Sequence, residues 1–172
     1  MKRSLLLTAA ILIIAATLWE LFLHTETPPG EEYSVLSVAD GDSFTLAKGP
    51  EEEEIRLFGI DSPERTQPFS NRARAFTRRM LLKGTIRLEP VERDRYGRTV
   101  AWVYLDTLCL NRLLVARGLA WHYTRYSDDA LLDSLEHSAR SRKIGLWSQP
   151  DPVPPWEYRK RKRLNTHAGN GS

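Results

Sequence analysis

The sequence has few of the residues that disulfide-stabilised or zinc-dependent proteins need. Cys109 is the single cysteine among 172 residues, so no disulfide can form within the chain and no cysteine-rich zinc site can be built. Because Cys109 stands between two leucines, we interpret it as a small buried hydrophobic residue. The four histidines are dispersed along the chain, which argues against a zinc site or a histidine nucleophile.

The expected domain also lacks an excess of positive charge, although the formal net charge is +3. Residues 156–172 carry five basic side chains and one acidic one, and residues 1–30 carry two of each sign, which leaves residues 31–155 with a net charge of about −1. The basic isoelectric point is therefore no evidence that the domain binds nucleic acid. Any field that attracts phosphate there must come from local arrangement and from a bound cation.

One long apolar run stands near the N-terminus, at residues 5–23, interrupted by two threonines and one glutamate. Basic residues precede the run and acidic residues follow it, which favours an orientation with the N-terminus inside the cell. The run is long for a signal peptide and just long enough to span a bilayer, which takes ~20 residues. We therefore expect an uncleaved membrane anchor, with a cleaved signal peptide as the alternative. Either interpretation predicts an extracytoplasmic domain, membrane-anchored or secreted.

Composition divides the chain into an N-terminal anchor or signal, a short polar linker, a folded domain and a tail that is first proline-rich and then basic, at residues 1–27, 28–32, 33–150 and 151–172. We expect the prolines between Pro150 and Pro155 to end regular structure. The basic run Arg159–Arg163 leaves two interpretations open: an arm that binds phosphates nonspecifically, or a solvated tail.

Hydrophobic periodicity predicts short strands followed by helices. The strands are expected near residues 35–38, 44–46, 55–58, 86–89 and 99–105, with a hairpin turn at 39–42 and a solvated acidic loop at 51–54. Helices are expected at residues 71–82, 110–117 and 128–143, the last of them capped by Ser127. This succession predicts an α+β fold that combines a small five-stranded β-barrel with about three helices.

Three short segments carry most of the chemistry, at residues 40–43, 56–64 and 94–98. Each places carboxylates or arginines beside a glycine or proline turn signal. Carboxylate oxygens suit a hard divalent cation such as Ca²⁺. Guanidinium groups suit a phosphate whose negative charge grows as it is attacked. The combination predicts metal-assisted cleavage of a phosphodiester.

Asp42 and Asp61 are the candidate metal ligands, because each lies at a strand end where a turn can aim a carboxylate. The backbone carbonyl of Ser62 could add a third oxygen. The alternative is that both aspartates only form turns, as Asp-Gly and Asp-Ser-Pro sequences commonly do. Asp40 is assigned to the turn or to a position behind the metal ligands, where it would contact them without binding the metal. Glu64 is the candidate general base, and the alternative for it is an ordinary exposed loop glutamate.

Arg56 and Arg98 are the candidate groups that stabilise the transition state. Arg56 alternates with apolar residues along its strand, so its side chain should point away from the core and into a cleft. Arg98 follows Gly97 in a tight turn that leads into the next strand. The alternative is a pair of ordinary surface arginines. Because phosphoryl transfer depends on electrostatic stabilisation more than on covalent chemistry, a metal and two arginines suffice in principle.

In this order, the three segments resemble the staphylococcal nuclease (thermonuclease) family. The resemblance covers residues 35–147 and rests on Val38–Ser43, Ile55–Glu64, Asp94–Arg98, Leu110-Asn111 with Gly118–Ala120, and Gly145–Trp147. It implies a five-stranded OB-fold barrel that hydrolyses DNA and RNA with Ca²⁺ and leaves 3′-phosphate ends. Ser43 and Ser62 depart from the family pattern, since threonine is common at both positions.

Position by position, the resemblance implies a role for each site residue. Those roles are calcium carboxylates for Asp42 and Asp61, a carbonyl ligand for Ser62, catalytic arginines for Arg56 and Arg98, the proposed base for Glu64, and nucleotide contacts for Tyr96 and Arg95. The family's second nucleotide-stacking tyrosine aligns ambiguously near residues 123–124.

We expect a monomer that acts on DNA and RNA, single-stranded or frayed, and that contacts a membrane through residues 5–23 if this segment is not cleaved. Two functions of other classes stay open: a non-catalytic OB-fold module that binds nucleic acid, and a membrane-tethered adaptor. The presence of all five charged site residues favours the enzyme.

Overall fold

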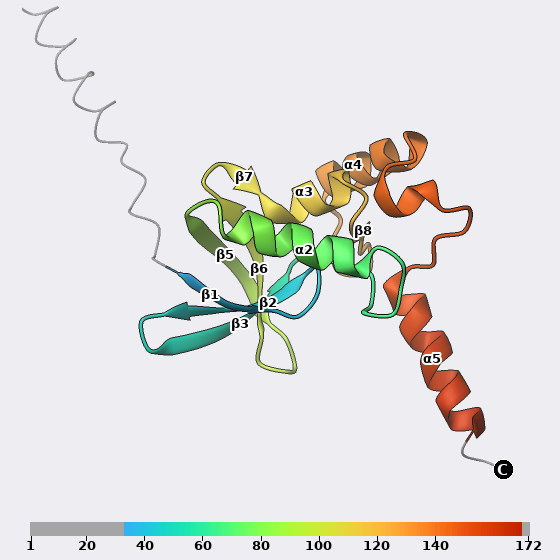
Figure 1. The fold of residues 1–172 in the computed structure, drawn as a ribbon, viewed down its shortest axis with the longest axis horizontal. Coiled ribbons are helices and arrows are strands. Elements are labelled where there is room, and N and C mark those ends of the chain that lie inside the picture. The colour runs from blue at the N-terminus through green and yellow to red at the C-terminus, as the bar shows by residue number, and fades with distance from the viewer. Residues whose placement is uncertain (1–32, 170–172) are drawn as a thin grey trace, which may run out of the picture. The chain divides into compact units, whose positions relative to one another are not determined.

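The structure is a computed structural model that describes residues 33–169 (Figure 1). The expected anchor at residues 5–23 and the linker at 28–32 lie outside the described residues. Within residues 33–169, no helix is both long enough and apolar enough to cross a membrane.

The main sheet has six strands, and its five long strands correspond to the five predicted from the sequence. They are β1 (Ser34–Val38), β2 (Ser43–Lys48), β3 (Glu51–Leu57), β5 (Ile86–Arg93) and β6 (Thr99–Leu105). Their order is β1-β2-β3-β6-β5, with β3 and β6 parallel and the other neighbours antiparallel. The mixed α+β class is confirmed and the strand order is consistent with an OB fold. The predicted barrel is only partly confirmed, because in residues 33–169 no ladder joins β1 to β5 and the sheet is open.

Three two-residue strands were not predicted. They are β4 (Ile60–Asp61), β7 (Leu108–Cys109) and β8 (Trp121–His122). Two residues are too few to show a hydrophobic period, so no pattern in the sequence predicts these strands. β4 pairs with β8, and this pairing places Asp61 opposite Trp121.

The acidic run at residues 51–54 was predicted to be a loop, and this was wrong. All four glutamates belong to β3 and pair with β2 in continuous register, from Lys48 opposite Glu51 to Thr45 opposite Glu54. The ladder supplies the backbone hydrogen bonds that a free loop would lack, while three of the four side chains stay exposed. The turn therefore contains only residues 49–50.

Helices α2 (Ser70–Leu81), α3 (Leu110–Ala116) and α4 (Ala130–Ser141) confirm the three predicted helices, and the short 3₁₀ helix η1 (Gly145–Ser148) follows α4. The cap of α4 differs from the prediction. Asp129 caps it by accepting a hydrogen bond from the Leu132 amide at 2.7 Å. Ser127 lies two residues before Asp129, and its hydroxyl accepts a hydrogen bond from the Asp129 amide.

A further helix, α5 (Pro155–Gly169), contradicts the expectation that the prolines end regular structure. Pro155 is its first residue. Proline is well suited to that position, because its φ is already helical and the missing N–H has no partner to lose there. The basic run is thus part of a helix rather than an irregular tail.

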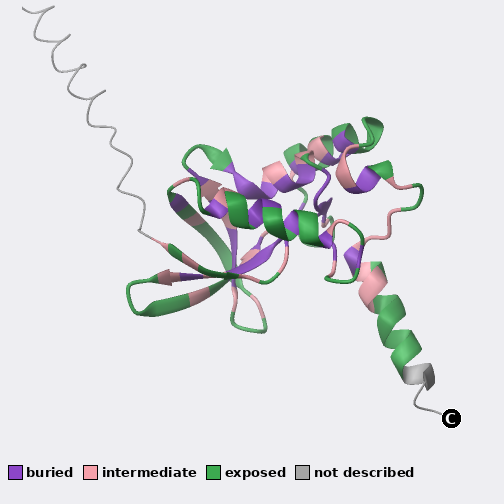
Figure 2. Ribbon diagram, in the orientation of Figure 1, coloured by how far each residue is buried: buried purple, intermediate pink, exposed green. Residues whose placement is uncertain are grey.

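One hydrophobic core joins the sheet to α2, α3 and α4, and a smaller cluster contains Trp121, Ala139, Leu146 and Trp147. Figure 2 shows the buried residues concentrated between the strands and these helices, whereas α5 is exposed beyond its first turns. Trp156 of α5 packs partly buried against the smaller cluster. This contact attaches the helix to the domain.

Asn111 links α3 to the strands that carry the site. Its side chain is fully buried, accepts a hydrogen bond from the Val103 amide at 3.0 Å, and donates to the carbonyls of Phe58 and Ala101 at 2.9 and 3.2 Å. Phe58 lies in the connection between β3 and β4, so Asn111 fixes the path that leads to Asp61.

Replacing this side chain should destabilise the fold. Asn111→Ala leaves buried backbone groups without partners, each of which costs about 1–3 kcal/mol, so we expect the free energy of unfolding to fall by about 2–4 kcal/mol. Urea denaturation followed by tryptophan fluorescence measures it. Arg74→Ala, an exposed change on α2, is the control. A loss below 1 kcal/mol for Asn111→Ala would contradict this role.

Candidate active site

The hairpin between β1 and β2 positions Asp42, the first candidate metal ligand. The Asp42 amide donates to the Asp40 carboxylate at 3.1 Å, which confirms Asp40 as a turn residue. The Asp42 carbonyl accepts from the Leu57 amide at 2.8 Å, so the backbone of Asp42 is tied to the end of β3. The side chain of Asp42 is 1% exposed, as is that of Asp61 on β4.

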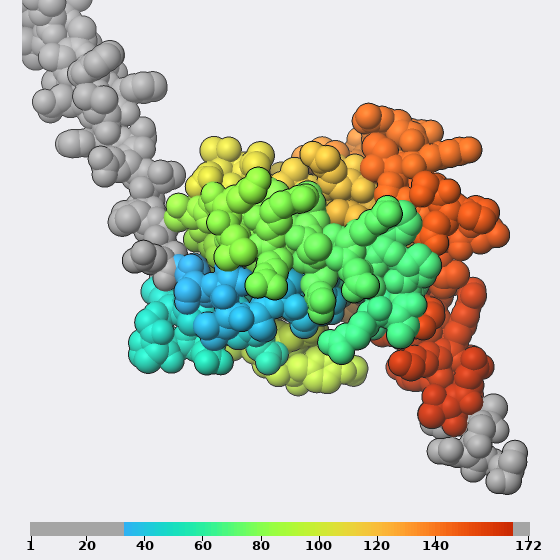
Figure 3. Space-filling view, in the orientation of Figure 1, coloured from blue at the N-terminus to red at the C-terminus, as the bar shows by residue number. Residues whose placement is uncertain are grey.

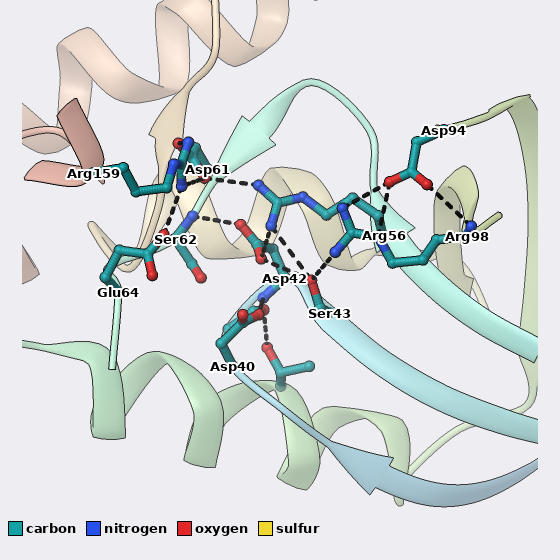
Figure 4. A network of polar contacts seen from close by, with 12 residues as sticks. Asp40, Asp42, Ser43, Arg56, Asp61, Ser62, Glu64, Asp94, Arg98 and Arg159 are labelled. Atoms are coloured by element: carbon teal, nitrogen blue, oxygen red, sulfur yellow. Dashed lines mark hydrogen bonds and ion pairs between the residues drawn. The ribbon is translucent and has the colours of Figure 1, made fainter. Parts of the chain in front are cut away.

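Arg56 on β3 joins the two aspartates (Figure 4). Its Nη1 lies 2.7 Å from Oδ1 of Asp42, and its Nη2 lies 2.7 Å from Oδ1 of Asp61. A single guanidinium therefore bridges two carboxylates that come from different strands. The predicted direction of the Arg56 side chain, away from the core, is confirmed.

The surroundings of Asp42 and Asp61 disfavour the charged form of both carboxyl groups. Burial raises the pKa of Asp42 from about 3.8 to about 7, against the opposing attraction of Arg56. Burial and the nearby Asp42 charge raise the pKa of Asp61 as well. Burial acts to lower the pKa of Arg56, but the two aspartates more than reverse this, so Arg56 remains a cation. Arg56 carries one positive charge between two buried carboxylates and cannot neutralise both, so a second cation stabilises the pair.

The donor set fits a hard cation that takes several oxygens. Ser62 follows Asp61 directly, and its amide donates to Oδ2 of Asp42 at 2.5 Å. Its hydroxyl is buried and has no hydrogen-bond partner among the described residues. No group of three or more His, Cys, Asp or Glu side chains in residues 33–169 is arranged to hold a metal. A cation here would therefore need backbone and water oxygens besides Asp42 and Asp61, as Ca²⁺ accepts.

Asp94 orients the second arginine. Its Oδ1 accepts from the amides of Tyr96 and Arg98, and its Oδ2 lies 2.8 Å from Nε and 2.7 Å from Nη2 of Arg98. The Nη1 atoms of Arg56 and Arg98 then approach the hydroxyl of Ser43 at 3.3 and 3.4 Å. The two arginines converge on one point, which two independent surface arginines would not do.

Glu64 stands at the edge of the same site, with its side chain 37% exposed. Gln67 fixes the backbone of Glu64 through two hydrogen bonds. Oε1 of Gln67 accepts from the backbone amide of Glu64 at 2.9 Å, and the backbone amide of Gln67 donates to the Glu64 carbonyl at 2.7 Å. Oε1 of Glu64 accepts a hydrogen bond from Arg159 at 2.7 Å, on the side of the carboxylate that faces Asp61 (Figure 4). The alternative of an ordinary exposed loop residue is therefore disfavoured.

A cleft of about 850 Å³ lies beside the buried aspartates' partner Arg56. Arg56, Glu64 and Arg98 line it together with aromatic and further basic side chains, among them Tyr96, Arg95, Tyr123 and Tyr126. Tyr96 is 68% exposed, and the guanidinium of Arg95 lies 4.7 Å from its ring centroid. The two tyrosines near the ambiguous alignment, at 123 and 126, both line the cleft.

Arg159 of α5 is a residue of this site that the sequence interpretation missed. Its guanidinium lies 2.8 Å from Oδ2 of Asp61 and 2.7 Å from Oε1 of Glu64. It stands in a basic run that had been assigned to the tail. The available signal was Pro155, which marks a helix start and so predicts that Trp156 and Arg159 lie about one turn apart on one face.

Comparisons with known proteins identify the family of the chain. The staphylococcal nuclease homologue family matches residues 54–149. An uncharacterised endonuclease of Escherichia coli is 38% identical over 129 residues, which cover 74% of this chain and 84% of the relative. The chain belongs to the staphylococcal nuclease family.

Other members support the same conclusion. The micrococcal nuclease of Shigella flexneri is 31% identical over 170 residues, covering 92% of each chain. The staphylococcal-like nuclease CAN1 of Arabidopsis thaliana is 38% identical over 109 residues, covering 63% of this chain and 34% of the relative. Membership of the staphylococcal nuclease family makes this chain a nuclease, an enzyme that hydrolyses phosphodiester bonds.

Arg56 should also stabilise the metal-free fold. In Arg56→Ala the two buried aspartates lose the guanidinium that bridges them, and removing one partner of a buried ion pair costs about 3–5 kcal/mol. Urea denaturation in the presence of a chelator measures the loss. Arg98→Ala, whose side chain is 26% exposed, is the control and should lose less than about 1 kcal/mol. Equal losses in the two variants would contradict the bridging role.

Proposed function

We propose that this nuclease is calcium-dependent, acts on single-stranded or frayed DNA and RNA, and leaves 3′-phosphate ends. The observation that carries the proposal is the buried pair Asp42 and Asp61, which is bridged by Arg56, a residue that lines the cleft together with Arg98. Burial of two carboxylates side by side is costly for stability, and a cation-binding role accounts for it.

Each side chain has a distinct task in this proposal. Asp42, Asp61 and the carbonyl of Ser62 would hold Ca²⁺, which when bound polarises a phosphoryl oxygen. Arg56 and Arg98 donate to the phosphoryl oxygens and stabilise the charge that develops as a water attacks phosphorus. Glu64 lies at the cleft and accepts the proton of that water. Asp94 and Ser43 act through the arginines, by fixing where their guanidinium groups lie.

The cleft suits an unpaired strand better than a duplex. Exposed Tyr96 and its neighbour Arg95 offer an aromatic face and a cation, and stacking of a base on an aromatic ring contributes about 1–3 kcal/mol. A nucleophilic water needs no 2′-hydroxyl, so the same residues can act on DNA and on RNA.

The proposal places this domain outside the cytoplasm, as a monomer attached to a membrane by residues 5–23 or secreted after their removal. A non-catalytic OB-fold module is the second candidate. It is disfavoured because Asp42, Arg56, Asp61 and Arg98 are held by one another or by Asp94, rather than scattered over the surface.

Activity should require Ca²⁺. Cleavage of single-stranded DNA by the purified protein should stop in excess chelator and return on adding Ca²⁺, whereas Mg²⁺ should support it poorly because it demands a stricter octahedral geometry. Gel analysis of the products, with and without phosphatase treatment, identifies the 3′-phosphate ends. Undiminished cleavage in chelator would refute the metal assignment.

Conservative changes of the arginines should be costly. Arg56→Lys and Arg98→Lys keep the charge but lose the planar pair of donors, and loss of one such donor lowers kcat about 10²–10³-fold, or ~3–4 kcal/mol. Single-turnover cleavage at saturating Ca²⁺ measures the effect. The control is Arg87→Lys on β5, an exposed arginine paired with Glu89. Near-normal turnover in folded Arg56→Lys and Arg98→Lys would show that these residues do not contact the reacting phosphate.

A further inference from the structure

The first turns of α5 are attached to the domain by a stack of two rings and by a hydrogen bond between two hydroxyls. The rings of Trp156 and Tyr123 stack in parallel, with centroids 4.8 Å apart and an interplanar angle of 1°. The hydroxyls of Tyr158 and Thr66 lie 2.7 Å apart. In Figure 3, the beginning of α5 lies against the segment that precedes α2, and its later turns extend away.

The chain just before α5 is fixed as well. The side-chain amide of Gln67 donates to the Val153 carbonyl at 2.8 Å. Because Gln67 also holds the backbone of Glu64, one side chain connects the proposed base to the start of the helix. Gln67 therefore fixes the start of α5 relative to the active site. Arg159 follows about one helical turn after this start.

This attachment holds the side chain of Arg159 in the active site. Its Nη1 and Nη2 donate to Oδ1 and Oδ2 of Asp61 at 3.2 and 2.8 Å, and Nη1 also donates to Oε1 of Glu64 at 2.7 Å. Burial acts to lower the pKa of Arg159, but the hydrogen bonds to Asp61 and Glu64 more than reverse this, so it is a permanent cation. Figure 4 shows its guanidinium beside Asp61, opposite Arg56.

With Arg159 in place, every oxygen of the two candidate ligands already accepts a hydrogen bond. Asp42 accepts from Arg56 and from the Ser62 amide, and Asp61 accepts from Arg56 and from Arg159. A divalent cation needs lone pairs on these same oxygens and repels a guanidinium that occupies them. Of the donors to Asp61, Arg159 is the one whose side chain is more exposed, 37% against 18% for Arg56, so it is the donor that an entering cation reaches more easily.

We propose that Arg159 and Ca²⁺ compete for Asp61, so that α5 carries a cationic side chain that occupies the metal site until Ca²⁺ displaces it. The inference rests on the proposed calcium site. Arg159 thereby sets the calcium affinity of the enzyme, and by thermodynamic reciprocity Ca²⁺ weakens the attachment of α5.

Calcium titration of the metal-free, full-length protein by calorimetry tests the competition. Arg159→Ala and Arg159→Gln should each lower the Kd for Ca²⁺ roughly tenfold, within the usual range of coupling between sites. The matched control is Arg161→Ala, which removes the same charge from the same helix at an exposed residue paired with Glu157. Its Kd should stay within about twofold of the wild-type value, whereas a shift as large as that of the Arg159 variants would mean a general charge effect and overturn the proposal.

Two further variants separate this inference from the proposed function. Asp42→Asn removes a proposed ligand that Arg159 does not contact, and it should abolish calcium binding. If the wild-type protein does not bind Ca²⁺, or if Asp42→Asn binds it equally well, the calcium site itself is wrong. If Ca²⁺ binds through Asp42 while both Arg159 variants keep the wild-type Kd or bind more weakly, only the competition is refuted.

Hydrogen exchange of α5 gives a readout that does not depend on activity. Ca²⁺ should speed amide exchange in the peptide that spans residues 155–166 of the wild-type protein, because it removes the Arg159 contacts. In Arg159→Ala the same peptide should exchange faster from the start and should not respond to Ca²⁺. Exchange that is unchanged or slower in the wild-type protein at saturating Ca²⁺ would overturn the proposal.

Discussion

The arrangement of the site depends on one constraint, the burial of Asp42 and Asp61 next to each other with Arg56 between them. Both carboxyls are almost fully buried, and burial raises the pKa of each. Such a pair persists only where the surrounding backbone holds it. The hairpin that ties Asp42 to Leu57, and the pairing that sets Asp61 opposite Trp121, supply that support. The fold therefore maintains a site that needs additional positive charge.

Positive charge reaches the site from three directions. Arg56 comes from the centre of the sheet, and Arg98 comes from the turn between β5 and β6, oriented by Asp94. Arg159 comes from a helix at the far end of the sequence. Arg56 and Arg98 converge on the hydroxyl of Ser43, and Arg56 also bridges the two buried carboxylates. Arg159 contacts Asp61 and Glu64 instead, so each of the three arginines has a different set of partners.

Much of the fold and most of the site could be predicted from local patterns. The alternation of apolar residues identified the five long strands, and the turn residues beside Asp42, Asp61 and Arg98 identified the segments that carry the chemistry. The two-residue strands β4 and β8 could not be predicted, since their pairing joins segments about 60 residues apart. The glutamates at 51–54 were assigned to a loop because their side chains are polar, whereas the ladder with β2 decides their backbone conformation.

The available residue types follow from the order of residues alone: carboxylates and arginines at turns, one cysteine, and a basic run after several prolines. Membership of the staphylococcal nuclease family follows from it too, because ordered motifs survive as a linear pattern. The meeting of Arg159 with Asp61 and Glu64 depends instead on tertiary packing, because the stacking of Trp156 on Tyr123 and the contacts of Tyr158 and Gln67 bring together residues about 95 positions apart. Local propensity describes each helix or strand separately, whereas an ion pair between them depends on how their surfaces pack.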